Sequence, residues 1–242
     1  MDEEAREKIR TEVLGIGDLF SYSHLYFSRE IWILLGITTA FKLPSNLLWN
    51  AMIASGSFVL LLGFLLIWIA GLALLPFCIT WMAWTMKKRV EMGEVSDEEA
   101  WREAWKRYMP LAWVMLLQGL LVVGGLLMFI VPGVMWMIDY IFGIYVVSAL
   151  PIQGQAALDY SKALVKGHWF EVFVLFALFT IVSNALPFLI DPKNLVLKSL
   201  TDTCIALITP YSLFPFGIWF LNLYYLHERT PAETVEPIYP YN

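Results

Sequence analysis

Charged residues are scarce in this sequence of 242 residues, and apolar residues are abundant. Only 15% of the residues are Asp, Glu, Lys or Arg, whereas about 25% are charged in a typical soluble domain. Apolar residues make up 59%, against about 45–50% in soluble domains. This composition excludes an ordinary soluble domain and indicates a membrane protein. The net charge of −5 is a weak clue, because the location of Lys and Arg matters more than the sum in membrane proteins.

Cysteines and catalytic patterns are also missing or few. Cys78 and Cys204 both fall inside apolar stretches, so we expect buried free thiols and neither a disulfide framework nor a cysteine metal site. The sequence contains no H-E-x-x-H, no G-x-S-x-G and no phosphate-binding glycine loop, which argues against an enzyme. It names no cofactor. Basic residues flank the apolar stretches instead of forming a patch, so nucleic-acid binding is not expected.

Six apolar stretches are long enough to cross a bilayer, since a hydrocarbon core about 30 Å thick needs about 20 helical residues. They cover residues 30–50, 55–86, 110–131, 133–152, 169–190 and 203–226. The third and fourth are separated only by a Val-Pro-Gly turn at Pro132 and Gly133, which predicts a tight helical hairpin. The expected fold class is all-α, a six-helix membrane bundle.

The distribution of Lys and Arg predicts the orientation of these spans. Of the sixteen Lys and Arg residues, all but Lys42, Lys193 and Lys198 would lie on the side of the two chain ends. The positive-inside rule therefore predicts that both ends lie in the cytoplasm. The expected location of the spans is the plasma membrane. The N-terminal segment MDEEAREKIRTEV lacks a secretory signal pattern, and the proline-containing residues 227–242 are expected to form an extended cytoplasmic tail.

Three polar segments precede spans one, three and five, and each is expected to form a helix in the cytoplasmic interface. They cover residues 17–30, 96–109 and 157–169, so the chain would consist of three units of one interfacial helix and two spans. In the second segment Ser96 and Glu99 match a capping box, and Trp101, Trp105 and Tyr108 share one helical face. We expect these rings to lie in the acyl boundary of the bilayer.

The third segment, ALDYSKALVKGHW, has a weaker apolar stripe and a glycine before the next span. Gly167 is expected to break or bend the helix before Trp169 begins span five. When the three units are aligned, Phe27, Tyr108 and Trp169 stand at equivalent entrances to their spans. These aromatic residues, together with Lys166, are predicted to contact the lipid interface.

Two of these stretches resemble a known family. A Pro-Gly turn, an apolar span and a helix of the form A-L-x-x-S-x-x-L-V-K-G, followed by aromatic residues, are similar to a group of largely uncharacterised multispanning membrane proteins. That group includes the membrane domain fused to some glycerophosphodiester phosphodiesterases. The matching residues are Pro132, Gly133, Ala157, Leu158, Ser161, Leu164, Val165, Lys166, Gly167, His168 and Trp169. The resemblance implies the fold more than the function, and Gln153 and Gly154 depart from it where an acidic residue is expected.

Asp139 is an ionisable residue inside the apolar stretch MWMIDYIFGIYVV. Such a group is costly in a membrane and faces a cavity, the bundle interior or a partner. It is either a proton, ion or substrate site or a carboxylate that fixes helix packing. Counting from Pro132 puts Asp139 about 10 Å along a helix. This is the predicted outer depth of Lys42, so we expect an ion pair or a polar cluster that includes Gln118.

Span six contains Pro210 and Pro215 with Asn222 beyond them, an arrangement that fits either a substrate site of a transporter or an ordinary kink. His24, His168 and His227 would share one depth, but nothing in their spacing requires a metal. The leading functional prediction is a non-catalytic scaffold or accessory subunit. It would pack against membrane lipids, another membrane protein or a second copy. The alternative is a transporter or amphiphile-handling protein with a site near Asp139 and the span-six break.

Overall fold

The computed structural model describes residues 3–93, 95–190 and 194–229, and every regular element in these ranges is a helix. The helices are α1 (Glu3–Thr11), α2 (Ile16–Ser55), α3 (Phe58–Met92), α4 (Asp97–Met128), α5 (Ile130–Asp139), α6 (Gly143–Ala149), α7 (Gln155–Val165), α8 (Trp169–Leu189), α9 (Leu195–Ala206) and α10 (Ile208–Arg229). Six candidate membrane spans are present in the described part, which confirms the predicted number. The chain is a multi-pass helical membrane protein.

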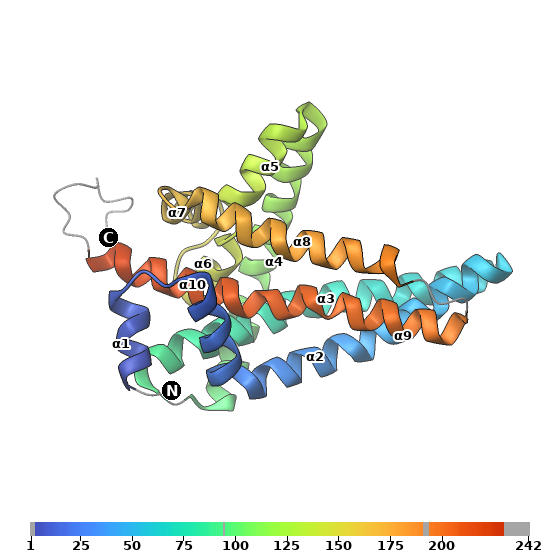
Figure 1. The fold of residues 1–242 in the computed structure, drawn as a ribbon, viewed down its shortest axis with the longest axis horizontal. Helices are drawn as coiled ribbons and strands as arrows, with labels where there is room; N and C mark the ends of the chain where they lie inside the picture. Colours follow the sequence, from blue (N-terminus) through green and yellow to red (C-terminus); the bar gives the residue numbers. More distant parts are fainter. Residues whose placement is uncertain (1–2, 94, 191–193, 230–242) are drawn as a thin grey trace.

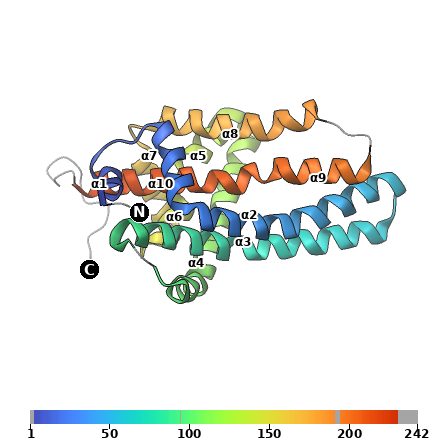
Figure 2. The same cartoon turned by 60° about the horizontal axis from the view of Figure 1, so that its bottom comes forward.

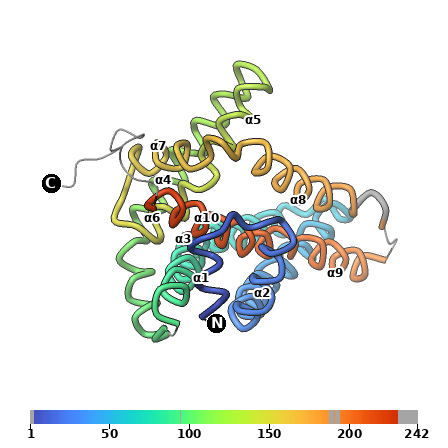
Figure 3. The backbone as a smooth tube through the Cα atoms, turned by 60° about the vertical axis from the view of Figure 1, so that its left-hand side comes forward, coloured from blue at the N-terminus to red at the C-terminus, as the bar shows by residue number. Residues whose placement is uncertain are grey.

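Helices α2, α3 and α8 and the consecutive pair α9–α10 run side by side along the long axis of the molecule (Figure 1). Helix α1, the end of α3, α7 and the last turns of α10 gather at one end, which we name the charged end. The α2–α3 connection, the last turn of α8 and the first turn of α9 lie at the opposite end, as Figure 2 also shows. The hairpin of α4 and α5 projects away from these helices (Figures 1 and 3).

The predicted tight hairpin between spans three and four is confirmed, but its turn lies at a different residue. Phe129 has extended backbone angles and separates α4 from α5, whereas Pro132 lies in the first turn of α5, where proline is tolerated. Gly133 has a packing role instead. A Cβ atom on Gly125 would lie only 2.8 Å from the Gly133 Cα, so these two glycines allow the helices to approach closely.

The fourth and sixth spans are divided into shorter helices. In span four the chain turns at residues 140–142, between α5 and α6. In span six, α9 begins at Leu195, earlier than predicted, and α10 follows it after Leu207, which keeps right-handed helical backbone angles. Pro210 lies in the first turn of α10, so the junction causes little disruption. Helix α10 continues to Arg229, so residues 227–229 are helical instead of extended, and the rest of the predicted tail lies outside the described residues.

Only one of the three predicted interfacial helices is a separate element. Residues 17–30 are part of α2, which has a kink at Phe27, and residues 96–109 continue through Pro110 as α4. Within α2, Phe27 has non-helical backbone angles (φ −119°, ψ 21°), so residues 17–26 form a helical part that a kink separates from the span, whereas α4 has no such interruption. Helix α7 does end before span five, where Gly167 has a φ of 99° as its sequence position predicted. Ser96 occupies the N-cap position of α4 without a side-chain capping bond.

Candidate functional site

Asp139 is paired with Lys162 on α7, and the expected pairing with Lys42 is wrong. The Lys162 Nζ lies 3.8 Å from the Asp139 Oδ2, and the side chain of Trp169 also interacts with this carboxylate. The prediction assumed that span four continues as one straight helix from Pro132. Instead, α5 ends at Asp139 and packs against α7, which lies at the charged end. Asp139 is therefore held beside the polar helix that follows it in the sequence.

Ser161 holds the turn between α5 and α6 in place. Its hydroxyl donates to the Asp139 carbonyl oxygen over 2.9 Å and accepts from the Phe142 backbone N–H over 3.1 Å. Ser161 is fully buried. The resemblance motif contains this serine, but no sequence argument gave it a role. The sequence did contain a signal for such a role, because Ser161 is a polar residue on the apolar face of α7.

Asn222 holds the N-terminal segment in place with its side-chain amide. Its amide nitrogen donates to the carbonyl oxygens of Ile9 and Glu12, each over 2.7 Å, and its amide oxygen accepts from the Leu14 N–H over 3.2 Å. The side chain is fully buried, and these three bonds occupy both its donor and its acceptor group. Asn222 is therefore a structural residue that fixes the connection between α1 and α2.

Lys42 and Gln118 make no hydrogen bond or ion pair with Asp139 or Asn222 among the described residues. Gln118 is on α4, facing the start of α6, where a Cβ on Gly143 would lie 3.9 Å from the Gln118 Oε1. Lys42 is on α2 and lines a cleft between α2, α3 and α10. Asp139, Asn222 and Lys42 thus have different surroundings, and whether Gln118 shares a polar cluster with Asp139 stays a prediction.

The cleft that Lys42 lines is the candidate functional site. It has a volume of about 480 Å³, within the range of about 300–1,000 Å³ that is typical of ligand pockets. Its walls are apolar side chains of α2 and α3, with contributions from α4, α6, α9 and α10. The lining includes the small residues Gly71, Cys78 and Ala206, whose short side chains take up little of this space.

Polar groups on the cleft wall are few. Among the residues that the structure describes, Lys42 is the only charged residue in the lining. The Lys42 ammonium has no hydrogen-bond or ion-pair partner in the described ranges. Ser45 lies one helical turn further along α2. This residue is largely buried, and its hydroxyl also lacks a partner in the described ranges. Thr38 differs, because its hydroxyl donates to the Leu34 carbonyl oxygen over 2.8 Å.

A polar network joins α2 to α9 beside the cleft, on the side nearer the opposite end. The Asn46 amide donates to the Thr203 hydroxyl over 3.0 Å, and the Asn50 amide donates to the Ser199 hydroxyl over 3.0 Å and to Asp202 over 3.3 Å. Sequence reasoning missed this network. The signal was present, because Asn46 and Asn50 on one helix and Ser199 and Thr203 on the other are each four residues apart and share a face.

A second, smaller cleft of about 260 Å³ lies between α6, α8 and α10. It shares Ile144, Thr209 and Leu213 with the first cleft, so the start of α10 borders both. No charged residue lines it within the described part of the chain. Of the two clefts, the first is therefore the one with a charged residue, Lys42, in its lining.

The predicted lipid-interface residues have different environments. Trp101 and Trp105 are each a little over half exposed, but both also pack on Phe77 of α3. Their ring centroids lie 4.6 Å (Trp101) and 5.2 Å (Trp105) from the Phe77 centroid. The Tyr108 hydroxyl donates to the Ala73 carbonyl oxygen over 2.8 Å. The aromatic face of this helix is thus shared between α3 and the surroundings.

Phe27 is not an interface residue, because it is fully buried under the Arg89 guanidinium and beside Phe214. The kink at Phe27 directs its ring into the core of the bundle. Trp169 is partly buried and stacks on Phe173 with centroids 5.5 Å apart. Lys166 is exposed at the end of α7, and its contact with the lipid interface stays a prediction.

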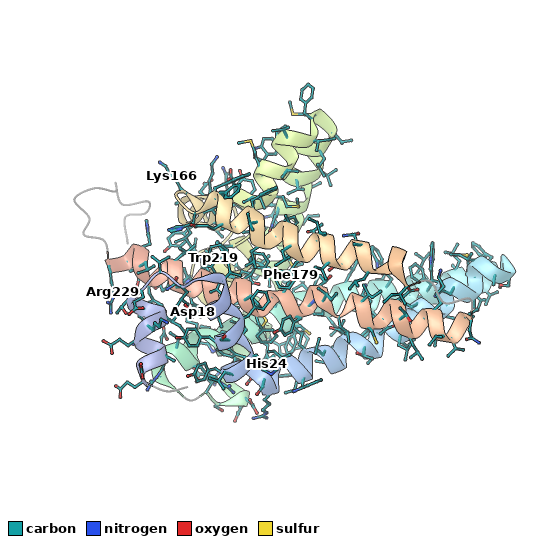
Figure 4. The ribbon with its side chains drawn as sticks, in the orientation of Figure 1. Asp18, His24, Lys166, Phe179, Trp219 and Arg229 are labelled. Atoms are coloured by element: carbon teal, nitrogen blue, oxygen red, sulfur yellow. The ribbon has the colours of Figure 1, made fainter. Side chains whose placement is uncertain are left out.

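Basic residues at the charged end are used to hold helices together (Figure 4 labels Lys166 and Arg229 there). Arg89 pairs with the buried Glu30, and Arg107 donates to the carbonyl oxygens of Val147 and Leu150 at the end of α6. Lys87 donates to the Ala149 carbonyl oxygen over 3.0 Å. Two cations thus stabilise the C-terminus of α6, where the helix dipole is negative.

Helix α1 is anchored at the same end. Lys8 lies 3.6 Å from Asp18 and near the Tyr22 ring, and interaction with Tyr22 and then Asp18 raises the pKa of Lys8. Of the three histidines, His168 contacts Glu171 and His227 contacts Tyr160. Among the described residues there is no group of three His, Cys, Asp or Glu side chains that could hold a metal ion.

Comparison of the chain with protein families, with curated proteins and with solved structures finds no match. The resemblance to multispanning membrane proteins stays a prediction.

Proposed function

We propose that this membrane protein is non-catalytic and binds an amphiphile in the cleft between α2, α3 and α10. The observation that carries this proposal is the cleft itself, an apolar space of about 480 Å³ with a single charged residue in its described lining. An apolar pocket with a few polar groups that fix orientation is the usual form of a small-ligand site. This proposal keeps the amphiphile-handling alternative but moves its site from Asp139 to Lys42.

The ionic groups elsewhere support this choice. Asp139, Glu30 and Arg107 have partners within the chain, and those contacts join neighbouring helices. They explain why these charged groups are present without a ligand. Lys42 has no such explanation, and an ionisable residue within a membrane helix is a functional-site hypothesis by default.

A cleft-filling variant tests the proposal. Gly71 lines the cleft, and a Cβ there would have its nearest neighbour, the Phe41 ring, at 3.9 Å, so Gly71→Leu adds a side chain without a backbone clash. Gly36→Leu is the matched control, because Gly36 is exposed on α2, is not part of the lining and would bring its Cβ near no other atom.

The measurement is native mass spectrometry of protein purified in a mild detergent. We expect one bound amphiphile per protein in the spectra of the unmodified chain and of the control Gly36→Leu. The amphiphile should be absent from the spectra of Gly71→Leu. If the unmodified chain carries no amphiphile, or if Gly71→Leu retains it, the cleft is not a binding site.

A second candidate function is the scaffold or accessory subunit. It is favoured by the α4–α5 hairpin, which projects from the bundle and exposes apolar side chains at its tip. The tip residues Leu127, Met128, Phe129, Ile130 and Val131 are each at least two-thirds exposed. Such a surface contacts lipid chains, another membrane protein or a second copy. The same mass spectra distinguish the two functions, because a subunit would retain a stoichiometric protein instead of an amphiphile.

A further inference from the structure

We propose that the cleft selects an anionic lipid, with its headgroup at Lys42 and Ser45 and one acyl chain extending toward the charged end. This inference rests on the proposed function and adds the ligand class, its orientation and the residues that select it. It is based on the position of an unpaired ammonium and an unpaired hydroxyl at one end of an apolar cleft.

An unpaired ammonium within a membrane helix is costly. A lysine near the bilayer centre is unfavourable, and an opposite charge with good geometry stabilises it there. Asp139 pairs with Lys162 and Glu30 with Arg89, whereas Asp202 accepts a hydrogen bond from the neutral Asn50 amide. No carboxylate among the described residues lies within ion-pair distance of the Lys42 ammonium. An anionic headgroup would supply that counter-charge.

Ser45 is a second polar group that would bind and orient a headgroup held by Lys42. Lys42 and Ser45 are three residues apart on α2, so their side chains lie on one face of the helix. The neighbouring polar residues Asn46 and Asn50 are already bonded to α9. Ser45 is 6% exposed, and its hydroxyl is free to donate to a headgroup oxygen held by Lys42.

The length of the cleft fits one acyl chain. Its α2 wall extends from Leu34 to Ser45, a distance of about 17 Å at 1.5 Å per helical residue. One leaflet of a hydrocarbon core has a thickness of about 15 Å, half of the usual 30 Å. On α3, the lining extends to Ile79 and includes Cys78. A chain anchored at Lys42 would therefore pass close to the Cys78 thiol.

Cys78 makes the site testable in the unmodified sequence. Cys78 lines the cleft, whereas Cys204 is exposed on α9 and is not part of the lining, so it reports general thiol reactivity. The protein is placed in nanodiscs of zwitterionic phosphatidylcholine, and the rate of N-ethylmaleimide addition to each cysteine is followed by mass spectrometry. Oleate, lysophosphatidic acid, lysophosphatidylcholine and oleyl alcohol are then added separately.

We expect the two anionic amphiphiles to slow modification of Cys78 at concentrations about tenfold lower than the zwitterionic and neutral ones, the factor for one charge-assisted contact. Cys204 should be unaffected. Lys42→Met should abolish this tenfold preference, and Lys42→Arg should keep it. Lys198→Met, which removes a lysine on α9 outside the cleft, should behave like the unmodified chain.

The outcomes separate the inference from the proposed function. If all four amphiphiles protect Cys78 equally, or if Lys42→Met keeps the preference, the headgroup assignment is wrong while amphiphile binding stands. If none of them protects Cys78, binding in the cleft itself is wrong. A preference for lysophosphatidic acid over oleate would identify a phosphate headgroup, and the reverse order a carboxylate. Thermal unfolding of Lys42→Met serves as the folding control.

Discussion

Ser161 illustrates how much one buried hydroxyl can contribute where two helices meet. It accepts the Phe142 N–H and donates to the Asp139 carbonyl oxygen, so it satisfies two backbone groups in a turn that has no helical hydrogen bonds to supply them. The Lys162–Asp139 ion pair next to it is weaker, because the Lys162 side chain is 57% exposed. The hydroxyl, and not the ion pair, is therefore the main stabilising contact of this turn.

We predict that Ser161→Ala lowers the free energy of unfolding by about 1–2 kcal/mol, since it leaves a buried N–H without its partner. Ser148→Ala is the control, because the Ser148 hydroxyl bonds only to the Ile144 carbonyl oxygen in its own helix. Thermal unfolding in detergent compares the two variants. Equal unfolding temperatures for both would show that the turn is held by other contacts.

Asn222 acts at the same scale but joins segments more than 200 residues apart in the sequence. We predict that Asn222→Leu releases residues 9–14, because the carbonyl oxygens of Ile9 and Glu12 and the Leu14 N–H lose their partner together. Trypsin cleavage after Arg10 should then be at least about tenfold faster, the factor for a loss of 1.4 kcal/mol.

Asn184→Leu is the control for this experiment. The Asn184 side chain is exposed and donates only to the Thr180 carbonyl oxygen in its own helix. Cleavage after Arg10 should be unchanged in that variant. Slow cleavage in Asn222→Leu would mean that α1 is held by its other contacts, such as the bond from Arg10 to the Val90 carbonyl oxygen.

At the scale of elements, the α4–α5 hairpin depends on close contact between two helices. A Cβ on Gly125 would approach both the Gly133 Cα and the Trp136 ring to 2.8 Å. We predict that Gly125→Val destabilises the hairpin by about 1–3 kcal/mol through overpacking. The measurement is hydrogen exchange in α5, which should increase because the helix is only ten residues long and cannot be stable alone.

Gly124 provides a control at the adjacent position, since a Cβ there would meet no atom within 4 Å. Gly124→Val should leave exchange in α5 nearly unchanged. Valine has a higher helix propensity than glycine, so propensity alone predicts no loss in either variant. If both valine variants have the same effect, close contact at Gly125 is not what stabilises the hairpin.

At the scale of the whole molecule, the fold gathers most basic residues at the charged end, and their orientation across the membrane is a prediction. In a variant without Cys78 and Cys204, we expect Ser55→Cys to react with an impermeant maleimide added to intact cells, and Glu98→Cys to be protected. Both positions are exposed in the structure. Labelling of Glu98→Cys alone would mean that the charged end faces outward.

Some features of this protein follow from the sequence alone. The number of spans, the all-α class and the break at Gly167 depend on local chemistry: runs of apolar residues, and a glycine that tolerates a positive φ. The spacing of Asn46 and Asn50, and of Ser199 and Thr203, shows that each pair shares one helical face. The contacts in the structure are needed to show that these two faces meet. Lys42 was predicted as a polar-site residue, but its surroundings were not.

Tertiary structure decided which residues meet. Asp139 contacts Lys162 instead of Lys42 because span four ends as a helix at Asp139 and packs on α7. Asn222 faces the N-terminal segment, and Phe27 lies in the core, because of how α1 and α2 pack on α10. Helical periodicity specifies the face of a helix on which a residue lies, but not the helix that covers that face. The cleft at Lys42 has the same origin, since it is a space between the consecutive helices α2 and α3 and the distant helix α10.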